Sequence, residues 1–191
     1  WDSYYKNKEN QAQVFQTLCE DDENRIWAGT YSSGFYVLDR ESGRELAQYP
    51  NSQTPNLASC KFVMNLYKDS DGDIWIGGVT NLISYSKSKK EFRVYSQQPM
   101  RSFMEFAPGK ILLGCTYSLI LLDKASGHIT YLTECLAQDI IVRGDDIWVA
   151  TAGDGLLHYN YKTKKANRIT MEAGLPSNFV NSLTYDNGYI W

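Results

Sequence analysis

The sequence predicts an all-β protein, and three observations predict it: a composition rich in strand-forming residues, no helical periodicity, and a repeated phrase of strand and turn. The 191 residues include 14 tyrosines and 5 tryptophans, and aromatic residues make up 14% of the chain. Aromatic side chains favour strands over helices. No segment sustains the three- and four-residue spacing of apolar residues that an amphipathic helix requires. Strands are therefore expected throughout.

A short apolar strand recurs along the chain. It reads RIWAGT, DIWIGG, KILLGC and DIWVAT at residues 25–30, 73–78, 110–115 and 146–151, and a shortened copy, YIW, lies at residues 189–191. The central residues of these copies are 48, 37, 36 and 43 residues apart, counted along Trp27, Trp75, Leu112, Trp148 and Trp191. Spacings of about 40–50 residues are typical of one four-stranded propeller blade.

Each copy lies inside a longer unit that always divides in the same way. An apolar strand and a tight turn containing Asp-Gly, Pro-Gly or Asn-Gly precede it at residues 62–72, 102–109 and 179–188. These residue pairs tolerate the backbone angles of hairpins. A third strand follows, and then a more polar fourth strand that reads ELAQY, EFRVY, HITYL or ANRIT. Apolar character falls from the first strand to the last, as in a blade whose outer strand faces water.

These units predict an all-β fold, namely a β-propeller segment of about four complete four-stranded blades plus partial blades at both ends. We expect a single propeller fragment over residues 1–191, with partial units at 1–6 and 178–191 and repeat units at approximately 13–49, 61–96, 102–132 and 137–170. One antiparallel sandwich is the alternative fold, but sandwiches rarely repeat turn chemistry at a fixed period. Because the chain starts and stops inside a repeat, we expect it to be a fragment without a transmitter of its own.

The repeated tryptophan indicates how the blades pack. A second strand covered on both faces tolerates an apolar run such as Ile-Trp-Ile, and we expect the tryptophan to fill the gap between blades. The residue two places further along is small in every complete unit: Gly29, Gly77, Gly114 and Ala150. A small residue there is expected to allow close approach of the backbone near the propeller axis.

Charge and composition argue against several classes of function. The formal net charge is -3, and no run of basic residues is longer than a pair. A nucleic-acid partner is therefore not expected, because binding phosphates requires a basic stripe. No apolar stretch approaches the ~20 residues that span a bilayer, so no membrane segment is expected within this chain. No basic and apolar leader opens the chain, so the protein either has none or the chain omits it.

The cysteines and histidines suggest neither a metal site nor a catalytic residue. The spacings of Cys19, Cys60, Cys115 and Cys135 fit no zinc pattern, and no cofactor or metal is expected. Whether any cysteines pair in a disulfide stays open. His128 and His158 lie in different kinds of strand, without a serine or cysteine motif beside them, so we interpret both as structural.

The acidic residues are also interpreted as structural. Residues 69–73 read Asp-Ser-Asp-Gly-Asp, but an EF-hand would need glutamate where Thr80 stands. We interpret this segment as a solvated hairpin. Acidic pairs for glycoside hydrolysis stay open, since any two carboxylates can converge in space. Most acids, however, lie in turns between first and second strands, on the face opposite the usual binding entrance, which weighs against a hydrolase.

The motif Leu-Pro-Ser-Asn-x-Val at residues 175–180, followed by Asp-x-Gly-x-Ile-Trp, resembles the two-component regulator propeller repeat. Residues 25–78 are most similar to this family, and the third unit is degenerate, with Leu112 in place of tryptophan. The resemblance implies a periplasmic region of a hybrid two-component sensor histidine kinase in the inner membrane. It also implies that this segment is not an enzyme and that it senses a small-molecule ligand, such as an oligosaccharide. WD40 and kelch repeats fit less well, and quinoprotein propellers rank second.

Ligand-binding residues are expected in the loops that join second to third strands and in those that join consecutive units, because these loops share one face of a propeller. The candidates are Tyr31, Lys61, Asn81, Arg101, Tyr117, Asp154 and Asn178. Aromatic faces with amides suit carbohydrate, and arginine or lysine suits an acidic sugar. Tyr31 and Tyr117 are the strongest candidates, because they recur at the same loop position in two units.

Two alternative functions stay open. A propeller enzyme, acting on polysaccharide as a lyase or hydrolase, predicts clustered acids or histidines at the mouth of the funnel. A protein-interaction scaffold predicts an apolar patch and no small-molecule pocket. Because an open arc of blades leaves exposed faces, self-association as a homodimer is also open. The ligand's identity and the number of blades in an intact ring are beyond the sequence.

Overall fold

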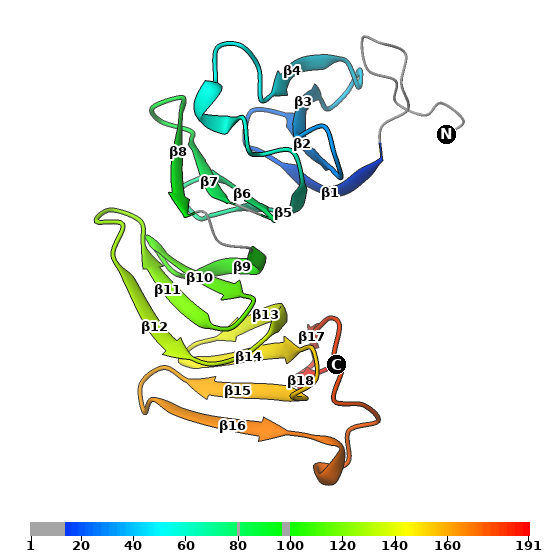
Figure 1. The fold of residues 1–191 in the computed structure, drawn as a ribbon, viewed down its shortest axis with the longest axis vertical. Coiled ribbons are helices and arrows are strands. Elements are labelled where there is room, and N and C mark those ends of the chain that lie inside the picture. Colours follow the sequence, from blue (N-terminus) through cyan, green and yellow to red (C-terminus); the bar gives the residue numbers. More distant parts are fainter. Residues whose placement is uncertain (1–13, 80, 97–99) are drawn as a thin grey trace. The chain divides into compact units, whose positions relative to one another are not determined.

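The computed structural model describes residues 14–79, 81–96 and 100–191 (Figure 1). The predicted partial unit at residues 1–6 and Thr80 lie outside the described residues. The chain divides into two compact units, an N-terminal unit (Trp1–Gln98) and a C-terminal unit (Pro99–Trp191). Each unit is built from four-stranded antiparallel sheets with the strands in sequence order, which confirms the all-β prediction of propeller blades.

The N-terminal unit contains two sheets and one short 3-10 helix, η1 (Pro55–Leu57). The strands of its first sheet are β1 (Phe15–Glu20), β2 (Arg25–Thr30), β3 (Phe35–Asp39) and β4 (Glu45–Tyr49). The strands of its second sheet are β5 (Val63–Lys68), β6 (Ile74–Gly78), β7 (Leu82–Ser86) and β8 (Glu91–Ser96).

The C-terminal unit repeats this plan. The strands of its first sheet are β9 (Met100–Ala107), β10 (Lys110–Cys115), β11 (Leu119–Asp123) and β12 (Ile129–Thr133). The strands of its second sheet are β13 (Ala137–Arg143), β14 (Asp146–Thr151), β15 (Leu156–Asn160) and β16 (Lys165–Ile169). A 3-10 helix, η2 (Met171–Ala173), and the short strands β17 (Tyr185–Asp186) and β18 (Tyr189–Ile190) follow. In the part of the chain that the structure describes, no helix is long and apolar enough to cross a membrane.

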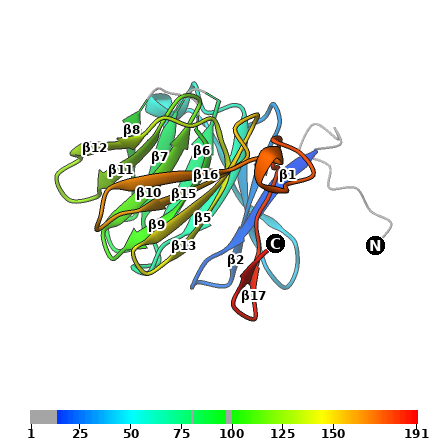
Figure 2. The ribbon, with the colours of Figure 1, turned by 90° about the horizontal axis from the view of Figure 1, so that it is seen from below.

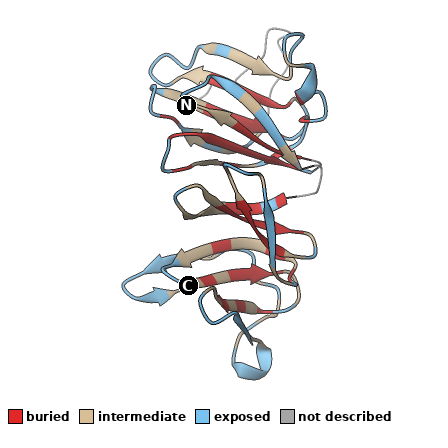
Figure 3. Cartoon of the chain, turned by 90° about the vertical axis from the view of Figure 1, so that its left-hand side faces the viewer, coloured by how far each residue is buried: buried red, intermediate tan, exposed pale blue. Residues whose placement is uncertain are grey.

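Most buried residues lie in the second and third strands of each sheet, so burial does not fall steadily from the first strand to the last as expected (Figure 3). Every residue of the second strand β6 is buried, whereas the fourth strand β16 is almost wholly exposed. This contrast confirms the expected wet outer strand. The strand β1 differs, because its residues alternate between partly buried and exposed. Only one face of that strand is covered, which is the pattern of a half-buried strand.

First strands connect the two sheets of each unit. In the C-terminal unit, β9 and β13 lie side by side (Figures 1 and 2). The small residues predicted from the repeat lie at this contact: a Cβ added to Gly114 would come within 2.6 Å of Ala137 Cβ. In the N-terminal unit, a Cβ on Gly29 would come within 2.5 Å of Val63 Cγ1, on the first strand of the next sheet. The small residue therefore makes room for the next blade's inner strand.

The tryptophan of the first blade lies between two sheets, as the repeat predicts. Trp27 is 1% exposed, and its ring centroid lies 4.9 Å from that of Tyr85 and 5.8 Å from that of Phe35. Phe35 belongs to the same sheet, whereas Tyr85 belongs to the second sheet. This aromatic group is part of the core of the N-terminal unit, which also includes Ile74, Ile76 and Ile83.

In the N-terminal unit, the turns between first and second strands are held by buried carboxylates. Asp69 Oδ1 accepts hydrogen bonds from the backbone N–H groups of Asp71 and Asp73, and its Oδ2 accepts one from Trp75 Nε1 at 2.8 Å. Asp69 is 3% exposed and Asp73 is 7% exposed. The interpretation of this segment as a solvated hairpin is therefore wrong for these two residues, because Asp69 is needed inside the turn as a hydrogen-bond acceptor.

The first blade uses the same device. Asp21 Oδ1 accepts from the backbone N–H groups of Glu23 and Arg25, and its Oδ2 accepts from Trp27 Nε1 at 2.7 Å and from Arg25 Nε at 2.6 Å. Burial raises the pKa of the Asp21 carboxyl, but the hydrogen bonds from Trp27, Arg25 and the backbone lower it by more. Its pKa therefore lies below the ordinary value, and the charged carboxylate is the form that holds the turn.

Candidate functional site

Two sets of connections meet at one end of the sheets in each unit. In the N-terminal unit, the Gly34 N–H donates to Lys61 O at 2.9 Å, so the β2–β3 loop contacts the connection that leads into β5. In the C-terminal unit, the N–H groups of Gly153 and Gly155 donate to Asn178 O at 3.1 and 2.8 Å. The loops expected to share a face are therefore in direct contact within each unit.

A hollow of about 500 Å³ lies among these loops of the C-terminal unit. It is lined by Thr116, Tyr117, Glu134, Cys135, Leu136, Ala152, Asp154 and Arg168. The lining comes from the β10–β11 loop, the segment between β12 and β13, the β14–β15 loop and the outer strand β16. Its volume is within the range of small-molecule sites.

Tyr117 stands at this hollow on a short loop. The loop is closed by a hydrogen bond from the Cys115 N–H to Ser118 O at 2.8 Å, which leaves only Thr116 and Tyr117 between the bonded residues. The side chain of Tyr117 is 82% exposed. A tyrosine this exposed makes little contribution to the core, so its ring face is available to a ligand.

Asp154 is positioned by the β14–β15 loop. Thr151 Oγ1 donates to Gly155 O at 2.6 Å and accepts from the Asp154 N–H at 3.1 Å. Gly155 has a φ of 75°, and a Cβ there would lie 2.1 Å from Ile169 O, so only glycine fits at this point. This tight loop places Asp154 beside strand β16.

Arg168 links Asp154 to the neighbouring connection. Its Nη1 lies 3.0 Å from Asp154 Oδ2, and its Nη2 donates to the backbone oxygen of Glu134 at 2.8 Å. Both ends of the guanidinium group therefore have partners inside the hollow. Sequence reasoning did not select Arg168 or Glu134, because neither belongs to a repeated motif, and the only signal was a charged residue on a polar outer strand.

Cys135 is buried in the wall of the hollow. Burial raises the pKa of its thiol to about 12, so the thiol is neutral near pH 7. A nucleophilic cysteine needs a lowered pKa, because the thiolate is the reactive form. Cys135 therefore provides apolar surface to the hollow and no reactive group.

The other two candidates in this unit lie outside the lining of the hollow. Arg101 Nη1 donates to Gln138 Oε1 at 3.1 Å, which connects strands β9 and β13. Asn178 Oδ1 accepts from the Met171 N–H at 2.8 Å, and its backbone oxygen holds the β14–β15 loop. Of the seven predicted residues, the structure therefore brings Tyr117 and Asp154 together around one cavity.

The candidates in the N-terminal unit are arranged differently. Tyr31 is 59% exposed and packs edge-on against Phe62, with ring centroids 5.5 Å apart. Lys61, which precedes Phe62 in the sequence, is also exposed. Asn81 is 2% exposed, and its Nδ2 donates to Ser59 Oγ at 2.8 Å. The amide of Asn81 therefore connects the end of the β6–β7 loop to the segment before β5 and does not face solvent.

Tyr31 and Tyr117 do not occupy the same loop position, so that expectation is wrong. The β2–β3 loop is closed by a hydrogen bond from the Thr30 N–H to Gly34 O, with three residues between, whereas the loop containing Tyr117 has two. Tyr31 is the first of its three residues, and Tyr117 is the second of its two. The β2–β3 loop instead matches the β14–β15 loop, which has the same length and the same bond from a threonine Oγ1 to a glycine oxygen.

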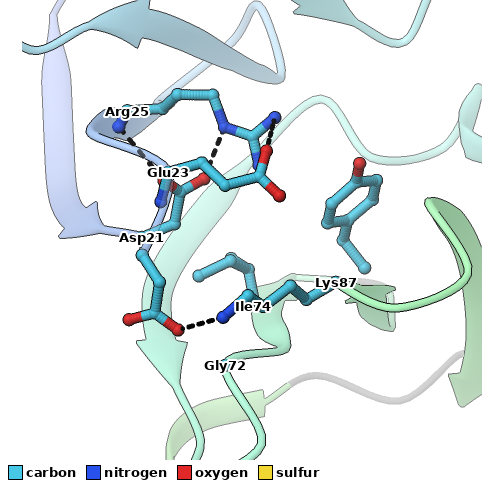
Figure 4. A pocket seen from close by; sticks show the side chains of 8 residues that line it. Asp21, Glu23, Arg25, Gly72, Ile74 and Lys87 are labelled. Atoms are coloured by element: carbon cyan, nitrogen blue, oxygen red, sulfur yellow. Dashed lines mark hydrogen bonds and ion pairs between the residues drawn. The ribbon is translucent and has the colours of Figure 1, made fainter.

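At the opposite end of the N-terminal sheets, a narrow crevice is filled by ion pairs (Figure 4). Asp22 Oδ1 lies 2.7 Å from Lys68 Nζ, and its Oδ2 lies 2.8 Å from Lys87 Nζ. Glu23 pairs with Lys90 and with Arg25. These pairs join the β1–β2 turn to the second sheet and leave no space for a ligand, so the crevice is structural.

His158, predicted to be structural, connects strands β14 and β15. Its Nε2 lies 2.7 Å from Asp146 Oδ1, and its ring stacks on Trp148 with centroids 4.2 Å apart. Among the described residues, no group of three or more His, Cys, Asp or Glu side chains is arranged to hold a metal ion.

Comparisons with known proteins identify the repeats. A family model described as "Two component regulator propeller" matches residues 9–32 and 56–80, so these segments are repeats of that kind. No curated protein matches the chain. The matched segments contain the β1–β2 and β5–β6 hairpins of the N-terminal unit.

Several solved structures are similar to the chain. The extracellular domain of BT4673 from B. thetaiotaomicron, described as a one-component system, is 17% identical, with a TM-score of 0.80 over 98% of this chain and 27% of that one. The extracellular domain of BT3049 from the same organism, described as a hybrid two-component system, is 24% identical, with a TM-score of 0.78 over 97% of this chain and 26% of that one. U3-55K is 12% identical, with a TM-score of 0.71 over 86% of this chain and 53% of that one.

These solved structures share few identical residues with the chain. At such low identity they establish the propeller fold and nothing about ligands. The chain spans about a quarter of the length of the two bacterial domains.

Proposed function

We propose that this segment, which contains two-component regulator propeller repeats, is part of the extracytoplasmic sensor of a hybrid histidine kinase and recognises an oligosaccharide. The observation that carries the proposal is the hollow in the C-terminal unit, where the exposed Tyr117 ring lies with Asp154 on the loops that usually bind ligands in this fold. The family match supports the regulatory role. The segment itself has no catalytic role in this proposal.

The same comparisons support an extracytoplasmic location. The similar structures are extracellular domains, one of which is described as part of a hybrid two-component system. We therefore place the segment in the periplasm, as part of an inner-membrane protein whose kinase modules lie elsewhere in its chain. A homodimer is also part of this proposal.

Ligand binding would act by shifting the equilibrium between two arrangements of the sensor. A ligand changes the state of a sensor only if it binds one arrangement better than the other. Tyr117 and Asp154 sit on loops anchored in β10, β14 and β15, so a ligand in the hollow connects two blades. Stiffening that connection is the physical change that would be passed to the membrane-proximal part of the protein.

A thermal-shift screen of the full chain against oligosaccharides tests the proposal. A saccharide at 100 times its dissociation constant should stabilise the native state by about 2.7 kcal/mol. We expect this shift to be lost in Tyr117→Ala and kept in Tyr131→Ala, which removes an exposed tyrosine from the outer strand β12. Tyr31→Ala tests the loops of the N-terminal unit in the same way.

The outcomes separate the alternatives. A shift that is lost only in Tyr31→Ala would move the site to the N-terminal unit. Turnover of a polysaccharide would replace sensing by a propeller enzyme. If no saccharide shifts the melting temperature but a protein partner does, oligosaccharide recognition is wrong and the segment is an interaction scaffold.

A further inference from the structure

We propose that the hollow of the C-terminal unit selects uncharged saccharides and discriminates against those that carry carboxylate or sulfate groups. This inference rests on the proposed function and names the class of ligand. It departs from the expectation that arginine or lysine at the loops would favour an acidic sugar. The reason lies in how the charges of the hollow are already paired.

The only cationic side chain in the lining is committed to partners. Arg168 contacts Asp154 Oδ2 through Nη1 at 3.0 Å and the Glu134 backbone oxygen through Nη2 at 2.8 Å. Arginine recognises an anion best when its fork of N–H groups is free to bind two oxygens side by side. An acidic sugar bound in that way would compete with Asp154 for the Nη1 group of Arg168.

The sum of charges in the lining is negative. The two carboxylates of Glu134 and Asp154, set against the one guanidinium of Arg168, leave a net charge of -1. Burial keeps the thiol of Cys135 neutral by raising its pKa to about 12. An anionic ligand would therefore meet like charge, which opposes binding most strongly at low ionic strength.

The remaining groups suit a neutral sugar. The ring of Tyr117 is 82% exposed and offers a face on which the C–H groups of a pyranose can pack. Asp154 accepts hydrogen bonds from hydroxyl groups, and the guanidinium and Thr116 can donate to them. A vicinal diol donates and accepts at once, so it can join the Asp154–Arg168 pair without separating it.

The test compares oligosaccharides that differ only in oxidation at C6. Suitable pairs have the same linkage, namely α-1,4-galacto-oligosaccharides with α-1,4-oligogalacturonates and β-1,4-manno-oligosaccharides with β-1,4-oligomannuronates, titrated calorimetrically into the full chain. We expect the neutral member of a recognised pair to bind about tenfold more tightly at low salt, and the difference to shrink as salt is added. The affinity for the neutral member should be the same at low and at high salt.

Variants test whether the discrimination against acidic sugars depends on residues of the hollow. Glu134→Gln removes one negative charge and keeps the backbone oxygen that Arg168 contacts, so it should narrow the difference in affinity between the neutral and the acidic ligand. Asp154→Asn should narrow this difference in affinity further, because the substitution frees the Arg168 guanidinium for an anion. Tyr117→Ala should weaken the neutral ligand about tenfold or more, since stacking on an aromatic ring is lost. Tyr131→Ala, outside the hollow, should change neither affinity.

Three results would overturn the inference. If the acidic member binds as tightly as the neutral one or more tightly, the selectivity is wrong while saccharide sensing stands. If Tyr117→Ala leaves the affinity for the neutral sugar unchanged, the ligand binds elsewhere. If the chain binds neither member of any pair, the proposed function fails together with the inference.

Discussion

At the scale of single residues, the first two blades share one arrangement: a buried carboxylate accepts the turn's N–H groups and the tryptophan's indole N–H. Asp21 with Trp27 and Asp69 with Trp75 are both six residues apart. The later blades lack it, because Phe106 and Val142 stand six residues before Leu112 and Trp148. In the fourth blade the tryptophan stacks on His158 instead.

This arrangement predicts a large effect for Asp69→Ala. The substitution leaves two backbone N–H groups and the Trp75 indole N–H without their acceptor, and each buried unsatisfied donor costs about 1–3 kcal/mol. We expect the free energy of unfolding of the chain to fall by about 3 kcal/mol, measured by urea denaturation.

A double-mutant cycle separates the indole hydrogen bond from the turn. In a Trp75→Phe background, Asp69→Ala should cost less than in the native sequence, because one of the three donors is already gone. Equal costs in the two backgrounds would show that Asp69 acts through the turn alone. Glu41→Ala, an exposed substitution in another turn, is the matched control and should be close to neutral.

At the scale of elements, exposed ion pairs join the first turn of the N-terminal unit to its second sheet. Hydrogen bonds from Lys68 and Lys87 lower the pKa of Asp22 to about 2. An aspartate in an unfolded chain has a pKa of about 3.9. Because the folded-state pKa is the lower one, these pairs stabilise the fold fully above about pH 4, and this contribution is lost as the pH falls through about 2.

The prediction is an acid-dependent loosening of this connection. Between pH 5 and pH 2, the melting temperature should fall less steeply in Asp22→Asn than in the native chain, because the variant lacks this titrating group. Salt should reduce the contribution of Asp22 at pH 5, since exposed pairs are screened. Melting curves that fall in parallel for the two proteins would contradict a role of Asp22.

At the scale of the whole molecule, the four sheets are grouped in pairs into two compact units, each with its own core. In both units a glycine of a second strand faces the first strand of the following sheet, as Gly29 faces Val63 and Gly114 faces Ala137. Each unit has one such contact, which explains why the repeat carries a small residue at this position.

Gly114→Ala should therefore destabilise the C-terminal unit. The new methyl would lie 2.6 Å from Ala137 Cβ, and overpacking of this kind costs about 2 kcal/mol. Ala137→Gly in the same chain removes the opposing methyl and should recover part of that loss, although glycine in a strand has its own cost. Amide hydrogen exchange in β9, β10, β13 and β14 measures both effects. Destabilisation that Ala137→Gly does not reduce would place the clash elsewhere.

The sequence by itself determined the strands, the turns and the blade repeat. These features depend on residues close together in the chain: a Gly in a hairpin, the apolar run around Trp75, or the polar outer strands. It did not indicate that Asp69 is buried, because a carboxylate in an Asp-Gly turn is usually solvated and only packing around Trp75 encloses it.

Tertiary structure alone decided the candidate site. Tyr117, Glu134, Asp154 and Arg168 come from four separate segments, and only the packing of β9–β12 against β13–β16 brings them around one hollow. In the N-terminal unit, the contact of Asn81 with Ser59 likewise leaves the asparagine buried. The side chains on these loops vary from blade to blade, so neither their distances nor the pairing of Arg168 with Asp154 could be inferred before the blades were assembled.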